Sequence, residues 1–185
     1  MFNVGFNDSR SLKVALVAHC ILNQNTVARG LAIAPGLLSS VVRVLESLNY
    51  GVVQLPCPET LYSGLLRWWQ TKEQYESIGY RLHCRKLARN VTVLSGELTR
   101  CGVRIEAVIG LRGSPSCAVS EVSVGWHGGD PLKAEPRNRV SGMGIFMYEL
   151  KRRLEKIGVK PIFIDIERKT LDRSVSEMIK ALTQS

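Results

Sequence analysis

Four short apolar runs constrain the fold of this chain more than any other feature. The first, Leu12–Ala18, is nearly continuous in apolar residues, which is typical of a strand buried on both faces of a parallel sheet. The other three runs are Val52–Leu55, Val103–Gly110 and Lys160–Asp165. Segments of helical or loop character separate them. This order predicts a three-layer α/β sandwich with a mostly parallel sheet and right-handed crossovers.

Helical spacing is clearest over Leu37–Leu48, with Pro35 in the first turn and Gly51 as a stop. Lys72–Cys101 is helical in composition, with a break expected near Gly79. The remaining expectations are a helix opened at Gly142 and ending at Lys156, a last helix capped by Thr170 or Asp172, loops over 19–34 and 59–70, and a long loop or hairpin over 118–139.

Length and composition favour a single α/β domain over residues 1–185, with 45% hydrophobic and 22% charged residues. No apolar run approaches the roughly 20 residues that span a bilayer. The polar segment Met1–Arg10 lacks a signal-peptide pattern, so we expect a cytoplasmic protein. In a reducing compartment, five cysteines are ligands, catalysts or core residues rather than a disulfide framework.

The chain is basic, with 25 Lys plus Arg against 16 Asp plus Glu and a net charge of +9. Such a charge attracts nucleic acids or anionic substrates. The basic residues are spread over helical segments such as Arg81–Arg89 and Lys151–Lys156, and no basic strand studded with aromatic residues accompanies them. A solvated basic face is therefore favoured over an RNA-binding surface, although RNA contact stays open.

Three cysteines, Cys20, Cys57 and Cys117, each follow the carboxyl end of a predicted strand. Open α/β sheets place their ligands at that edge, and adjacent strands lie about 4.8 Å apart. The three thiols can therefore meet at one metal or iron–sulfur centre and leave one coordination position open. The alternative is that they are buried small hydrophobic residues. Their polar and turn-forming neighbours, such as the prolines on both sides of Cys57, favour a site.

The blocks around these cysteines, His19–Asn25, Pro56–Glu59 and Gly113–Cys117, resemble those of the TudS-type thiouracil desulfidases and their small single-domain relatives. The resemblance extends in order from the first strand to the Gly142 helix. The chain departs from the desulfidases at Thr26, where they commonly carry a second cysteine, and at Ala118, where a glycine is usual.

The resemblance implies a Rossmann-like or flavodoxin-like domain that carries a 4Fe-4S cluster. By position, the three ligands are Cys20, Cys57 and Cys117, and the fourth iron is free to take sulfur from the substrate. The implied activity is a non-redox desulfidation, the exchange of C=S for C=O in a thiolated small molecule such as a thio-nucleobase.

Such a reaction needs a positioned carboxylate to handle protons, and Glu59 in the Cys-Pro-Glu block is the candidate. Its alternative role is to cap the next helix or to pair with Arg67. Ser114 and Ser116 are candidates for orienting the substrate, with turn formation as their alternative.

Residues for substrate binding are expected in two loops. Asn23 and Asn25 have amides that suit the edge of a heterocycle, and Trp68 could stack on a planar base together with its aromatic neighbours. These aromatic side chains could equally form an apolar lid or an oligomer contact. Two histidines, His19 and His127, are considered as proton carriers. The other two cysteines, Cys84 and Cys101, are expected on helices away from the strand ends.

Three other functions remain open from the sequence. One is an iron–sulfur protein that transfers sulfur to RNA. Another is a metal-free α/β binding module whose cysteines only pack. A third is nucleophilic catalysis by Cys117 with the help of a histidine. The oligomeric state and the identity of the thiolated substrate are not predicted.

Overall fold

The structure, a computed structural model, describes residues 8–126 and 138–184. Its centre is a four-stranded sheet in the order β2-β1-β3-β6, in which every neighbouring pair is parallel. The strands are β1 (Lys13–Val17), β2 (Gly51–Gln54), β3 (Arg104–Leu111) and β6 (Ile162–Ile166). The predicted α/β fold with a mostly parallel sheet is confirmed, and each of the four apolar runs forms a strand within two residues of its expected bounds.

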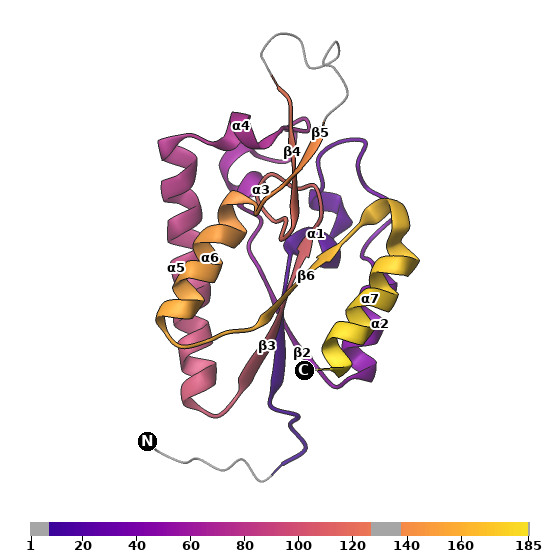
Figure 1. Cartoon of the computed structure of the whole chain (residues 1–185), viewed down its shortest axis with the longest axis vertical. Coiled ribbons are helices and arrows are strands. Elements are labelled where there is room, and N and C mark those ends of the chain that lie inside the picture. The colour runs from indigo at the N-terminus through magenta and orange to yellow at the C-terminus, as the bar shows by residue number, and fades with distance from the viewer. Residues whose placement is uncertain (1–7, 127–137, 185) are drawn as a thin grey trace.

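Helices cover both faces of the sheet and complete the sandwich (Figure 1). On one face lie α5 (Ile78–Arg100) and α6 (Ile145–Lys156), and on the other lie α2 (Ser39–Ser47) and α7 (Leu171–Thr183). The central strands carry the core because their side chains are buried on both faces, as with Leu16 in β1. None of the described helices is long and apolar enough to span a membrane.

The remaining elements gather at the carboxyl edge of the sheet (Figure 1). They are α1 (His19–Leu22), the short 3-10 helices η1 (Gln24–Thr26) and η3 (Arg168–Thr170), α3 (Pro58–Ser63), α4 (Lys72–Tyr75), and the antiparallel strands β4 (Glu121–Val124) and β5 (Asn138–Ser141). The strand pair agrees with the expected hairpin, and residues 127–137 between its strands lie outside the described residues.

Several local predictions were wrong. The expected loop over 59–70 contains α3, which Cys57 caps and Pro58 opens, and the expected loop over 19–34 contains α1 and η1. The break between α4 and α5 falls at Glu76 and Ser77 rather than near Gly79, because the Ser77 hydroxyl accepts the Tyr80 N–H and starts a new helix.

The starts of α2 and α7 also differ from the expectation. α2 begins at Ser39, so Pro35 precedes the helix instead of lying in its first turn. Thr170 takes the N-cap position of α7 but makes no capping hydrogen bond with its side chain.

Candidate functional site

Cys20 is positioned by the short helix that follows β1. The chain leaves the strand at Ala18, whose N–H donates to Ile109 O at 2.9 Å, and turns at once into α1. The buried Gln24 fixes the following loop, because its amide donates to Cys20 O and accepts the Ile33 N–H at 3.0 Å. Cys20 is therefore held near the sheet edge by hydrogen bonds within its own loop.

Cys57 is the N-cap residue of α3. Leu55 still pairs with β1, and two residues later the Cys57 sulfur accepts the Thr60 N–H at 3.4 Å. Pro58 occupies the first turn of α3 and needs no hydrogen-bond partner there. The thiol thus lies at the N-terminus of α3, where its sulfur accepts one of the N–H groups that have no partner within the helix.

Cys117 is held by a tight loop between β3 and β4. The Ser114 hydroxyl accepts the N–H groups of Ser116 and Cys117 at 3.2 and 3.0 Å. Two glycines permit this packing, because a Cβ on Gly110 would lie 2.4 Å from Cys117 O and one on Gly144 would lie 2.4 Å from Ser116 O. The backbone of this loop is therefore in close contact with β3 and with the N-cap residue of α6.

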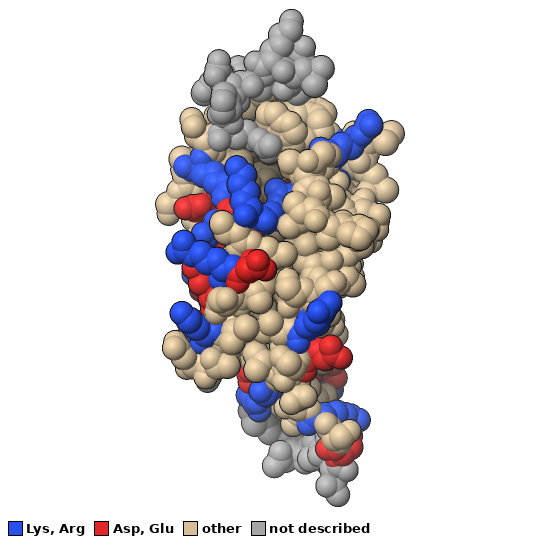
Figure 2. All heavy atoms as spheres, turned by 90° about the vertical axis from the view of Figure 1, so that its right-hand side faces the viewer, with Lys and Arg blue, Asp and Glu red and all other residues tan. Residues whose placement is uncertain are grey.

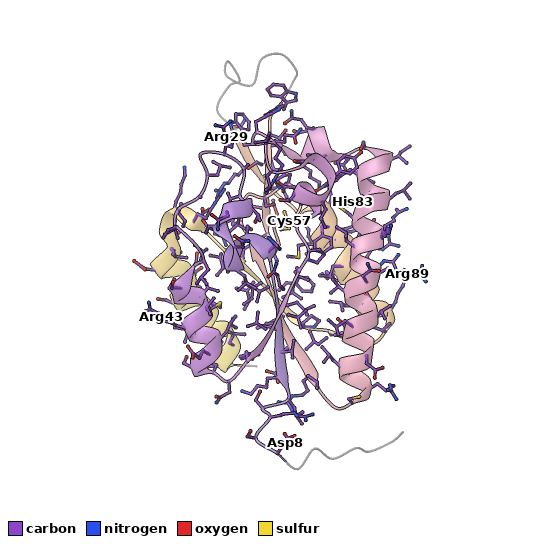
Figure 3. The ribbon with its side chains drawn as sticks, turned by 180° about the vertical axis from the view of Figure 1, so that it is seen from behind. Asp8, Arg29, Arg43, Cys57, His83 and Arg89 are labelled. Atoms are coloured by element: carbon purple, nitrogen blue, oxygen red, sulfur yellow. The ribbon has the colours of Figure 1, made fainter. Side chains whose placement is uncertain are left out.

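The three cysteines line the same pocket at the carboxyl edge of the sheet, together with Glu59 and Ser114. Figure 3 shows Cys57 inside this end of the molecule, among the loops that follow the strands. Burial, and then the neighbouring Cys57, raise the pKa of Cys20 to about 12. Burial also raises the pKa of Cys117, with Cys20 and Cys57 as the next causes, so the three sulfurs act on one another electrostatically.

Glu59 is fixed at both of its oxygens. The Ser114 hydroxyl donates to Oε1 at 3.2 Å, and Arg67 Nε donates to Oε2 at 3.4 Å. The side chains of Arg67 and Glu59 are only 5% and 15% exposed, so this ion pair is shielded from solvent. The predicted alternative, pairing with Arg67, is confirmed, and Glu59 also lines the pocket; its role in handling protons stays a prediction.

Sequence reasoning missed the importance of Arg67. Its guanidinium donates to Thr26 O at 2.9 Å, to Thr60 Oγ1 at 3.0 Å and to Gly64 O at 3.0 Å, and Nη2 lies 4.0 Å from the Cys57 sulfur. It thus joins the loop after β1 to α3 beneath the pocket. The available signal was a single charge within the apolar segment Leu65–Trp69.

The other predicted site residues lie around the pocket without lining it. Ser116 is fully buried, and its hydroxyl is 2.6 Å from the Tyr80 hydroxyl. The Asn23 side chain caps η1. Its oxygen accepts hydrogen bonds from the backbone N–H and from the side-chain amide of Asn25, at 3.1 and 3.0 Å.

Trp68 packs against the rings of Trp69 and Trp126, and its neighbour Trp69 is the residue that lines the pocket. The roles assigned to Ser116, Asn23, Asn25 and Trp68 stay predictions.

The remaining candidates lie elsewhere. His19 is next to the Gln54 amide, and burial lowers its pKa. His127 lies outside the described residues. Cys84 is buried in α5 and Cys101 follows its last turn; like the three strand-end cysteines, both are free thiols. The rest of the pocket wall comes from Val27, Ala28, Leu31, Arg67, Gln70, Leu111, Gly113, Pro115 and Arg168.

The donor set limits the kind of metal centre that this pocket could hold. Three cysteines line it, and thiolates select zinc, copper(I) or iron–sulfur groups over magnesium or calcium. Among the described residues, no three His, Cys, Asp or Glu side chains form a group that could hold a single metal ion. The chemistry of the three thiols is thus compatible with an iron–sulfur group.

Comparison with models of known protein families finds no match. A solved structure described as a 4Fe-4S-dependent thiouracil desulfidase, TudS, is similar over 90% of this chain and 97% of its own, with a TM-score of 0.47 and 17% sequence identity. The uncharacterized protein MJ0003 of Methanocaldococcus jannaschii is 32% identical over 170 residues, which cover 92% of this chain and 94% of that protein. The chain therefore belongs to the family of MJ0003.

Proposed function

We propose that this protein is an iron–sulfur-dependent desulfidase. It binds a 4Fe-4S cluster through Cys20, Cys57 and Cys117 and removes sulfur, as sulfide, from a thiolated small molecule such as a thio-nucleobase. The observation that carries the proposal is that cysteines from three separate strand ends line one pocket together with Glu59 and Ser114. The resemblance of the three cysteine blocks to the TudS-type desulfidases supports the same assignment.

The chain supplies three ligands where closed clusters usually have four. When bound, such a cluster supplies a Lewis-acidic iron without a protein ligand, which can polarise a C=S bond and accept its sulfur. The N–H groups at the start of α3 stabilise negative charge on Cys57, and Arg67 adds a positive charge 4.0 Å from the same sulfur. Both features favour a cluster that carries negative charge.

Glu59 is the general base in this proposal. Conversion of C=S to C=O consumes one water and releases one hydrogen sulfide, so both protons of the attacking water must leave its oxygen and two protons must reach the departing sulfur. The Glu59 carboxylate accepts the first at Oε1 and can return it. Ser114 donates to that same oxygen at 3.2 Å and so sets the direction in which its free lone pair points.

The pocket walls suit a planar, partly apolar substrate. Val27, Ala28 and Leu31 provide an apolar side, while Gln70 and Arg168 provide hydrogen-bond donors. Trp69 provides a flat aromatic surface on which a heterocycle can stack. This combination orients a thiolated ring and excludes bulk water from it.

The test is purification without oxygen, followed by visible absorption and measurement of iron and sulfide. We expect a broad absorption band at about 400 nm and about four irons per chain. Protein that stays colourless after cluster reconstitution would refute the proposal.

Activity is then measured as sulfide release from thiouracil and other thio-nucleobases. Glu59→Gln should retain the cluster and lose about 100-fold or more in rate, because it removes the base without removing a ligand. A cluster-loaded protein that releases no sulfide from any thioamide compound would leave the cluster assignment standing and overturn the desulfidase assignment.

A further inference from the structure

The two helical layers differ sharply in charge. In α5, five basic residues stand against one acidic residue, and in α6 four stand against two, so this layer carries +6 of the net charge of +9. In α2 and α7 the basic and acidic residues are equal in number. Figure 2 looks onto the α2–α7 side and shows red atoms among the blue ones, with much of the surface tan. The fold therefore concentrates on one face a charge that is spread along the sequence.

A groove between α5 and α6 collects these charges. The acid at this groove, Glu149, is buried and already neutralised by Arg85, whose Nε donates to it at 3.1 Å. The groove is lined by Arg85, Glu149, Arg152, Arg153 and Lys156. Within the described part of the chain, Arg152, Arg153 and Lys156 form no salt bridge, so their charges are available to a ligand.

A second hollow lies along the same pair of helices, nearer to the thiol pocket. Its lining includes Lys72, Tyr148 and the ion pair of Arg81 with Glu76, so Lys72 is the cation of this hollow without a carboxylate partner among the described salt bridges. Tyr148 is 46% exposed, and the guanidinium of Arg152 lies 5.7 Å from its ring centre. Only Thr71 separates Gln70, which lines the thiol pocket, from Lys72, which lines this hollow. The second hollow is thus next to the wall of the thiol pocket along the chain.

We propose that the α5–α6 groove binds the backbone of single-stranded RNA. A row of cations beside an exposed aromatic ring is the arrangement that binds single strands, with the cations on phosphates and the ring on a base. A concave groove suits a strand better than a flat bilayer surface, and the acid at the groove is already neutralised by Arg85, so it adds little repulsion of phosphate. The binding surface is independent of the proposed desulfidation, and only the delivery of a thiolated base to the pocket rests on that function.

The experiment measures binding of a fluorescent, unthiolated single-stranded RNA of about 16 nucleotides by anisotropy over a range of salt concentrations. The groove variant replaces three cations of α6 by glutamine, R152Q/R153Q/K156Q. Each phosphate contact contributes about 0.7 to the slope of log affinity against log salt, so the slope should fall by about 2 and affinity at about 0.1 M salt by about 100-fold.

The matched control removes the same charge from the opposite layer, as R43Q/R173Q/K180Q. It should leave the slope and the affinity close to those of the unmodified protein. Melting temperatures of both variants check the fold, and iron content checks that the thiol pocket is unaffected. Because the RNA carries no thio-base and no turnover is measured, the result does not depend on whether the protein is a desulfidase.

Three outcomes would overturn the proposal. The first is that the unmodified protein does not bind the RNA at about 0.1 M salt. The second is that both variants lose affinity equally, which would show a general effect of net charge. The third comes from a parallel measurement of binding to phosphatidylcholine vesicles with about 30% phosphatidylserine. If the groove variant bound RNA normally and lost binding only to these vesicles, the face would be a membrane-binding surface.

Discussion

The carboxyl edge of the sheet has two differently built sides. β1, β2 and β3 are each followed by a cysteine that lines the pocket, whereas β6 ends in the acidic residues Asp165 and Glu167. Asp165 accepts the N–H groups of Val119 and Ser120 at 2.8 and 2.7 Å, and also the Ser120 hydroxyl at 2.8 Å. It therefore fixes the loop that follows Cys117 without lining the pocket.

Under the proposed function, this difference separates residues that do chemistry from residues that hold them. The thiols at three strand ends would then be the ligands, while Asp165 accepts backbone N–H groups and Glu167 pairs with Arg139. If the comparison is correct, removal of a thiol abolishes the proposed metal centre, and removal of a carboxylate on the β6 side reduces stability and leaves that centre in place. The predictions below test this division.

The largest effect is expected from the three strand-end cysteines. Replacement of Cys20, Cys57 or Cys117 singly by serine should abolish the cluster, because two thiolates do not hold it. Cys101→Ser and Cys84→Ser are the controls and should retain full iron content after reconstitution, since neither thiol lines the pocket. Iron and sulfide analysis is the measurement. If Cys84→Ser lost the cluster while its fold was unchanged, the proposed set of three ligands would be wrong.

Arg67→Met should have the next largest effect. It leaves the shielded Glu59 carboxylate without its cation and removes the donors to Thr26 O and Gly64 O. We expect a loss of about 3 kcal/mol in the free energy of unfolding, measured with urea. Arg67→Lys keeps the charge but not the planar set of donors, so its loss should be about half as large. Equal losses in both variants would show that geometry, rather than charge, sets the role of this residue.

Asp165→Ala tests the β6 side. It removes the buried acceptor of the Val119 and Ser120 N–H groups, and because Val119 is half-buried and Ser120 is exposed, the loss should be about 1 kcal/mol of stability. Reconstituted at low temperature, the variant should still bind a full cluster. A variant of normal stability that cannot hold iron would contradict the division between the two sides.

The sequence was sufficient to predict the strands and the thiol pocket. Continuous apolar runs identify buried parallel strands, and their shared carboxyl edge brings Cys20, Cys57 and Cys117 together although 36 and 59 intervening residues separate them. Glu59 was placed correctly at the pocket because it is only two residues beyond Cys57.

What the sequence did not predict depends on side-chain direction and on distant partners. Ser114 and Ser116 share one turn, and only the structure distinguishes the hydroxyl that faces Glu59 from the one that faces Tyr80. In the same way, only the structure shows that Trp69 lines the pocket, whereas Trp68 packs against the rings of Trp69 and Trp126. The start of α3 was missed because cysteine is not among the usual capping residues, although its sulfur accepts the Thr60 N–H. The role of Asp165 depends on partners about 45 residues away, a separation that no local pattern reveals.

The smallest effect concerns the ion pair of Glu167 and Arg139, which ties β5 to the end of β6. Although burial raises the pKa of Glu167, the hydrogen bonds from Arg139 and from the Lys169 N–H outweigh it and hold the pKa below its usual range. A carboxyl group with a lowered pKa in the folded state adds stability above its unfolded pKa of about 4.3 and loses it as the pH falls through the folded value. Because Arg139 is about one-third exposed, we expect this contribution to be only about 0.5 kcal/mol. Urea unfolding at pH values from about 7 down to about 3 should show this loss in the unmodified protein and not in Glu167→Gln. An identical pH dependence in both proteins would mean that the pair contributes nothing to the attachment of β5, and the β6 side would then act through Asp165 without help from Glu167.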